Sequence, residues 1–134
     1  MEAETEEIKR ELAGIMKDRV VFALVYGSIL KPSFNAQSDV DVAVYLDKRD
    51  VAFQTRLDIY TILQEVLNRD VDVVILDNAD LIITMRVLAN GELIVNNNPE
   101  AFIRFKALKI GQYLDFKMSR KIIEDQMLGG RIYA

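Results

Sequence analysis

The spacing of hydrophobic residues divides the chain into helices and strands. Over residues 5–17 the apolar positions recur every three or four residues, which predicts an amphipathic helix with one buried stripe. These positions are Ile8, Leu12, Ile15 and Met16. Residues 20–26, 40–46 and 71–76 are instead short runs rich in valine and other strand-forming residues, and such runs predict strands.

Residues with special backbone preferences indicate where these elements begin and end. Gly27 breaks the first strand. Ser28 is expected to cap a short helical turn that ends near Pro32, because proline restricts the residue before it. Asp50 is the expected N-cap of a helix that runs to about Asn68.

The remaining elements complete a mixed arrangement of helices and strands. A short helix is predicted over roughly residues 80–88, and Asn90-Gly91 is a turn signal. Residues 92–95 are then expected to form a short edge strand. The alternation predicts an α+β or α/β fold, with a small mixed β-sheet flanked by helices. Residues 1–134 are expected to form a single domain.

The last predicted helix begins at Asn98-Pro99, because a proline in the first turn of a helix loses no hydrogen bond. It is expected to end at Gly129-Gly130, with a mobile tail from about residue 129. Its apolar face comprises Phe102, Phe105, Leu108, Tyr113 and Phe116. We expect this face to be core, with a partner surface as the alternative.

Composition narrows the chemistry that the chain can perform. It contains neither cysteine nor histidine, which excludes disulfides, thiolate metal sites and histidine general bases. The net charge of −4 argues against a protein whose main role is to bind nucleic acid. No apolar run is long enough to cross a bilayer and the acidic start does not resemble a signal peptide, so we expect a cytoplasmic protein without membrane contact.

Three aspartates stand out because they interrupt apolar strand sequence, where aspartate is normally depleted. Asp39 and Asp41 are two residues apart at the start of a strand, so their side chains point to the same face. Adjacent carboxylates repel unless a cation lies between them, and Mg²⁺ holding a nucleoside triphosphate is a natural occupant. Asp72 can join them if its strand lies beside theirs. With no histidine available, Asp72 is also the expected general base.

A purely structural explanation remains open for each of these residues. Asp39 could simply end the preceding loop, and both Asp39 and Asp41 could face solvent on an edge strand. Asp72 could occupy an exposed strand position. Gly27-Ser28 alone is a weak signal, although a glycine lets a phosphate approach the backbone and a serine offers it a hydroxyl and an N–H. The fixed spacing of all these residues favours the metal-binding interpretation.

The combination of Gly27-Ser28, ten further residues, Asp39-X-Asp41 and a later Asp72 resembles the nucleotidyltransferase superfamily that includes DNA polymerase β. More narrowly, the chain resembles the minimal nucleotidyltransferases (MNT), among them the MntA-type antitoxins of HEPN/MNT toxin–antitoxin systems. The likeness extends over most of the chain and is strongest at the motif.

The resemblance implies that the three aspartates bind two Mg²⁺ ions and that Gly27 and Ser28 hold the β- and γ-phosphates of ATP. Lys31 and Ser38 are further candidates for nucleotide binding. A hydroxyl would attack the α-phosphorus and pyrophosphate would leave, a nucleotidyltransferase reaction of the EC 2.7.7 type. The resemblance also implies a HEPN-domain toxin as partner, with which the chain could form an oligomer, and transfer of AMP to a tyrosine of that toxin.

One segment departs from the family pattern. Many MNT proteins carry Ala-Arg-Gly one residue after Gly-Ser, where this chain has Leu30-Lys31-Pro32. Lys31 keeps the charge but lacks the bidentate fork of arginine, which bears on triphosphate affinity and not on metal binding. Two alternatives stay open: an antitoxin that neutralises its partner by binding alone, and transfer to a small molecule such as an aminoglycoside. Basic candidates for contacts with nucleotide or partner are Arg86, Arg104 and Lys106.

Overall fold

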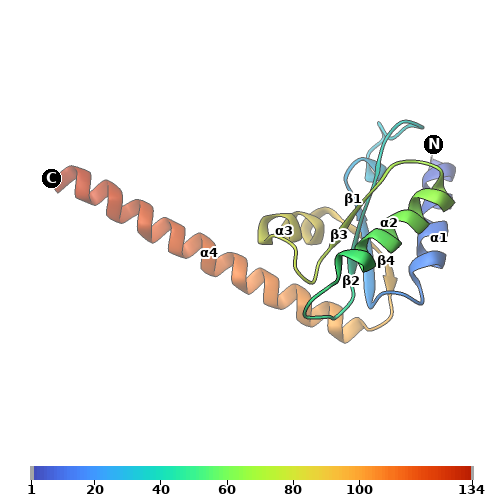
Figure 1. The fold of residues 1–134 in the computed structure, drawn as a ribbon. Coiled ribbons are helices and arrows are strands. Elements are labelled where there is room, and N and C mark those ends of the chain that lie inside the picture. The colour runs from blue at the N-terminus through green and yellow to red at the C-terminus, as the bar shows by residue number, and fades with distance from the viewer. Residues whose placement is uncertain (1, 134) are drawn as a thin grey trace.

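A four-stranded mixed sheet forms the centre of the computed structural model, which describes residues 2–133 (Figure 1). The strands are β1 (Phe22–Tyr26), β2 (Val40–Tyr45), β3 (Val71–Ile75) and β4 (Glu92–Asn96). Their order across the sheet is β3-β2-β1-β4. β1 runs antiparallel to β2 and β4, whereas β2 and β3 are parallel. The predicted mixed sheet is confirmed, and β4 lies at an edge as expected.

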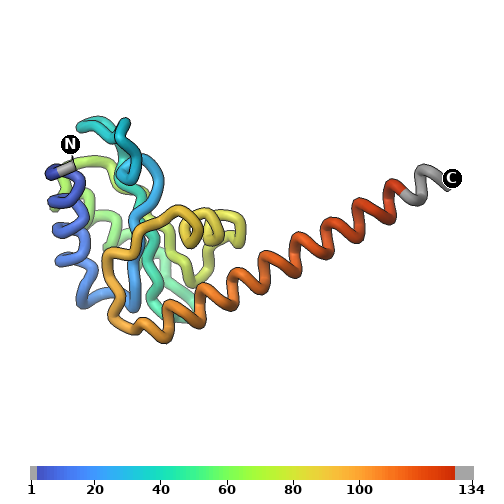
Figure 2. The backbone as a smooth tube through the Cα atoms, turned by 180° about the vertical axis from the view of Figure 1, so that it is seen from behind, coloured from blue at the N-terminus to red at the C-terminus, as the bar shows by residue number. Residues whose placement is uncertain are grey.

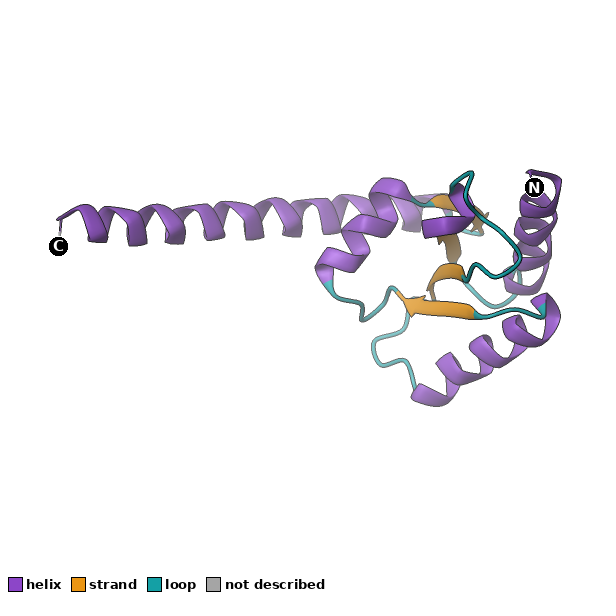
Figure 3. Cartoon of the chain, turned by 90° about the horizontal axis from the view of Figure 1, so that it is seen from above, coloured by secondary structure: helices purple, strands orange, loops and turns teal. Residues whose placement is uncertain are grey.

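Helices cover both faces of the sheet (Figure 3). They are α1 (Glu2–Met16), the 3₁₀-helix η1 (Gly27–Leu30), α2 (Phe53–Leu67), α3 (Leu81–Asn90) and α4 (Pro99–Tyr133). α1 and α2 pack on one face, where Leu12 and Leu63 are fully buried in the same cluster as Val42 and Val44. α3 and the first turns of α4 pack on the other face.

An aromatic cluster fixes the first turns of α4 against β1 and β2. Phe22 stacks on Tyr45 with ring centroids 4.8 Å apart. Phe102 and Phe105 of α4 meet Phe22 edge-on, at centroid distances of 5.0 and 5.4 Å. Such aromatic pairs each contribute about 0.5–1.5 kcal/mol beyond the area that they bury.

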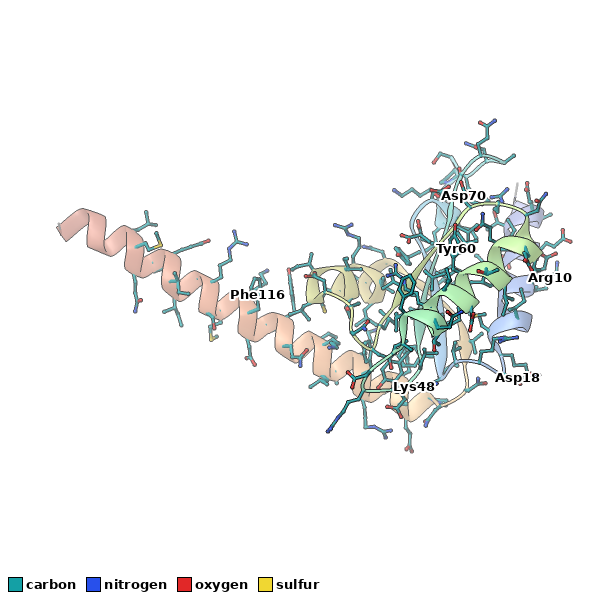
Figure 4. All side chains as sticks on the ribbon, in the orientation of Figure 1. Arg10, Asp18, Lys48, Tyr60, Asp70 and Phe116 are labelled. Atoms are coloured by element: carbon teal, nitrogen blue, oxygen red, sulfur yellow. The ribbon has the colours of Figure 1, made fainter. Side chains whose placement is uncertain are left out.

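Beyond these turns α4 leaves the sheet and projects away from it (Figures 1 and 2). Phe116, marked in Figure 4, is 46% exposed, and Leu108 is 58% exposed. Only the first part of the predicted apolar face is therefore core. None of the helices within residues 2–133 is both long and apolar enough to span a membrane.

Two predicted helix boundaries are wrong. α4 continues to Tyr133 instead of ending at Gly129-Gly130, because a glycine weakens a helix by only about 1 kcal/mol and does not block it. The mobility of the segment from about residue 129 stays a prediction. α2 begins at Phe53 with Ala52 as N-cap, so Asp50 lies outside the helix and does not cap it. The apolar stripe of α2 does not say at which turn the helix starts.

Candidate active site

Two of the three aspartates lie side by side on neighbouring strands. Asp41 of β2 and Asp72 of β3 are register partners in the parallel pair. Ala43 and Val74, two residues further along each strand, pack in the cluster beneath α3 and α4. Because side chains alternate along a strand, both aspartates point to that same face. Asp41 is half-buried and Asp72 is exposed on the edge strand.

Gly27 holds the end of β1 against the Asp41 carboxylate. Its φ of +75° lies in the region that favours glycine. A Cβ at this position would collide with Asp41 Oδ2. The preceding residue, Tyr26, is the register partner of Asp41 in the antiparallel pair. Glycine is therefore required both by the backbone conformation and by the close approach of the two strands.

Ser28 joins η1 to the segment that precedes β2. Its hydroxyl donates to the main-chain oxygen of Asp39 at 3.1 Å. It does not cap η1, whose N-cap is Tyr26, so the predicted capping role is wrong. Asp39 is exposed, immediately before β2. Burial, then Asp72, and then Asp39 raise the pKa of Asp41 above its ordinary value, because each disfavours a charged carboxylate there.

Tyr26 belongs to this site, although the sequence analysis did not single it out. Burial raises the pKa of Tyr26 to about 12, helped by Asp41 and Asp72, while Arg86 of α3 opposes the shift. Tyr26 therefore lies beside the carboxylate pair, and Arg86 is a basic candidate that the fold brings within electrostatic range. Alternation from Leu24, which faces α3, is the sequence signal that could have found Tyr26.

The carboxylates fit a divalent cation that is shared with a triphosphate. Among residues 3–128, whose side chains the structure describes, no group of three acidic side chains is arranged to hold a metal by itself. Mg²⁺, however, is usually bound by one or two carboxylates together with substrate phosphates, and Asp41 and Asp72 provide that number. Their mutual repulsion, which contributes to the raised pKa of Asp41, is relieved by a cation. Two metal ions held by all three aspartates stay a prediction.

The observed contacts of Lys31 and Ser38 do not include the side chains of the three aspartates. Lys31 lines a hollow of about 670 Å³ together with Lys9 and Glu92. The Lys9 ammonium pairs with Glu92 in the wall of this hollow at 2.6 Å, and none of the three aspartates lines it. Ser38 Oγ accepts a hydrogen bond from the N–H of Asn35 at 3.1 Å, which closes the loop before β2. Nucleotide binding by either residue stays a prediction.

A smaller hollow, of about 210 Å³, opens beside Asp72. Its wall includes Phe53, Arg56 and Tyr60 of α2 together with Val73; Tyr60 is marked in Figure 4. The hollow lies on the α2 side of the sheet, opposite to the face toward which Asp41 and Asp72 point. Because β3 is an edge strand, Asp72 is open to another molecule along that edge.

Comparison with known proteins identifies the fold. The family described as "Polymerase beta, Nucleotidyltransferase" matches residues 6–100. No curated protein matches the sequence.

Solved structures resemble most of the chain, and three of them serve as examples. A chain of the crystal structure described as a toxin–antitoxin with AMP-PNP has a TM-score of 0.74 and 20% identity, covering 90% of this chain and 98% of that chain. A chain of the toxin–antitoxin MntA–HepT has a TM-score of 0.71 and 19% identity, covering 92% of this chain and 98% of that chain. A chain of the tri-AMPylated Shewanella oneidensis HEPN toxin in complex with MNT antitoxin has a TM-score of 0.72 and 20% identity, covering 92% of this chain and 98% of that chain. At these identities the likeness is one of fold.

Proposed function

Because the chain belongs to the polymerase beta nucleotidyltransferase family, we propose that it transfers AMP from ATP, with Mg²⁺, to a hydroxyl group of a partner protein. The acceptor in this proposal is a tyrosine of a HEPN-domain toxin, for which the chain acts as antitoxin. The observation that carries the proposal is the Asp41–Asp72 pair beside Gly27, at the edge of the sheet.

Each residue of the motif has a role in this proposal. Asp41 and Asp72 hold Mg²⁺ with Asp39 as a further ligand, while Gly27 and Ser28 face the triphosphate. Bound Mg²⁺ would neutralise charge on the phosphates and stabilise the departing pyrophosphate. The electrostatics of the site support this assignment, since burial, Asp72 and Asp39 raise the pKa of Asp41 and a cation bound between the carboxylates would relieve their repulsion.

The proposed transfer is an in-line displacement at the α-phosphorus of ATP. The tyrosine oxygen forms a bond to that phosphorus while the bond from phosphorus to the pyrophosphate oxygen breaks. The phenolic proton passes to Asp72, which is exposed on the edge strand β3. The position of Asp72 at the open edge of the sheet supports an acceptor that is delivered by a second protein.

The outer part of α4 supports a protein partner. Solved structures of this fold include toxin–antitoxin complexes, one of them with a tri-AMPylated HEPN toxin. In this chain α4 exposes a series of large apolar side chains beyond the sheet, as surfaces that bind other proteins commonly do. They are Leu114, Phe116, Met118, Ile122, Ile123 and Met127. We propose that the toxin contacts this surface.

The experiment that tests the proposal is intact-mass spectrometry of the product of the neighbouring gene, tested as the HEPN partner, after incubation with the chain, Mg²⁺ and ATP. The wild type should add one or more AMP units, and Asp41→Asn should add none. Asp18→Asn is the matched control, because Asp18 is exposed on the turn after α1 (Figure 4). Equal transfer by Asp41→Asn would contradict the metal assignment.

A second candidate function is neutralisation by binding alone. It is favoured by the position of Lys31, the basic residue of the motif, which lines a hollow that contains none of the aspartates. It predicts that a triple variant with asparagine at Asp39, Asp41 and Asp72 still silences the toxin. If that variant binds the toxin and fails to silence it, occlusion is excluded.

A further inference from the structure

Arg69 is a nearly buried arginine for which the proposed reaction has no role. It lies in the turn between α2 and β3, and its side chain is 11% exposed. Its Nη1 atom donates to the main-chain oxygens of Asn35 and Ser38, at 3.4 and 3.3 Å. Its Nη2 atom pairs with Glu4 of α1 at 3.4 Å. The guanidinium also lies over the ring of Phe34, 4.8 Å from its centroid.

These contacts tie the loop before β2 to a turn that is distant in sequence. The loop spans residues 31–39 and ends in Asp39. Immediately after it, the N–H of Val40 donates to the main-chain oxygen of Asp70 at 3.0 Å; Asp70 is marked in Figure 4. The turn that carries Arg69 therefore holds the end of the loop through both a side chain and the backbone.

The fixed atoms lie on both sides of Asp39. The Ser38 oxygen belongs to the peptide bond before Asp39 and accepts from Arg69. The Asp39 oxygen belongs to the peptide bond after it and accepts from Ser28. With both peptide planes held, the remaining freedom of Asp39 lies in its side-chain torsions. Asp41 is fixed separately, by the pairing of β2 with both of its neighbours.

We propose that Arg69 is a positioning residue for metal binding, which sets the orientation of Asp39 relative to Asp41 and Asp72. The inference rests on the proposed function, because it takes these aspartates as the ligands of Mg²⁺ bound with ATP. Arginine suits this task because its planar guanidinium bonds the two loop carbonyls through Nη1 and Glu4 through Nη2 while it stacks on the Phe34 ring, which a compact lysine ammonium does not do. Groups that orient metal ligands from behind change metal affinity by about 10–100-fold.

The competing explanation is that Arg69 only braces the fold, by joining α1 to the loop and to the turn before β3. A brace affects the stability of the protein but not the affinity of the folded protein for metal. Metal affinity, measured separately from stability, therefore distinguishes the two roles.

The test measures the affinity of the full chain for Mn²⁺ in the presence of a non-hydrolysable ATP analogue. Electron paramagnetic resonance monitors the bound and free Mn²⁺. Arg69→Lys keeps the charge but loses the planar guanidinium that joins the loop carbonyls to Glu4 and stacks on Phe34. We expect its dissociation constant for Mn²⁺ to rise about tenfold, under conditions where circular dichroism shows a folded protein. Arg10→Lys is the matched control, since Arg10 is exposed on α1 (Figure 4) and should bind Mn²⁺ like the wild type.

Phe34→Leu provides a second test if Arg69→Lys does not fold. It removes the ring beneath the guanidinium but leaves the carbonyl contacts, so Mn²⁺ affinity should fall in the same direction and by less. If both variants fold and bind Mn²⁺ like the wild type, the inference is overturned and Arg69 is only a brace. If Arg69→Lys does not fold, wild-type Mn²⁺ affinity in Phe34→Leu overturns it in the same way. A wild-type chain that binds no Mn²⁺ with the analogue would overturn the proposed function, and the inference with it.

Discussion

Replacing Gly27 with alanine should affect the site far more than the fold. Gly27 has a φ of +75°, and a left-handed conformation costs an L-residue about 1–2 kcal/mol. The new Cβ would also collide with the Asp41 carboxylate. That carboxylate is the free end of a side chain, so it can turn away at little cost in stability, but it then leaves its place beside Asp72. Misplacing a reacting group by about 1 Å can slow a reaction about 10²-fold.

The assay compares the urea midpoint with the rate of AMP transfer by the folded protein. Gly27→Ala should lower the free energy of unfolding by about 1–2 kcal/mol and slow transfer about 10²-fold. Gly14→Ala is the control, because an added Cβ on that residue of α1 meets nothing within 4 Å. The control should gain up to about 1 kcal/mol of stability and keep its transfer rate. Wild-type transfer by Gly27→Ala would refute the reasoning from close approach.

Three further variants test the stability of the chain without its ligands. Asp41→Asn should have a higher urea midpoint than the wild type at neutral pH, because burial, Asp72 and Asp39 raise the pKa of Asp41 and so disfavour its ionised form in the folded state. This advantage should shrink as the pH falls through the raised pKa toward the ordinary value of 3.8; equal midpoints at neutral pH would contradict it. In thermal denaturation, Phe105→Ala should cost about 3–5 kcal/mol, because its ring is buried in the aromatic cluster. Phe116→Ala should cost less than about 0.5 kcal/mol, because Phe116 is 46% exposed, and a large loss there would mean that the outer part of α4 packs on the domain.

The strands could be predicted because each is a short apolar run that contrasts with the polar residues around it. The helix boundaries were harder, since a cap such as the one expected at Asp50, or a break such as the one expected at Gly129-Gly130, reflects preferences of only about 1 kcal/mol. Strand order depends on pairing that no local pattern encodes. The pairing of β4 with β1, for example, joins two strands that are far apart in the sequence, and neither strand's residues identify the other as its partner.

The candidate site also contains residues that the sequence predicts and residues that only the fold reveals. Asp41 and Asp72 could be found because aspartate is anomalous in an apolar strand, and the parallel pairing of β2 and β3 brings them together. Tyr26 joins them only through the antiparallel register of β1 and β2. Arg69 contacts Ser38, which is 31 positions away in the sequence, and no sequence pattern around either residue predicts that contact.

The measurement that tests the account most directly is a crystal structure of the full chain with Mg²⁺ and a non-hydrolysable ATP analogue. We predict a metal ion between Asp41 and Asp72, with the phosphates beside Gly27 and Ser28. A nucleotide bound in the hollow around Lys31, with no metal ion at the aspartates, would contradict the account.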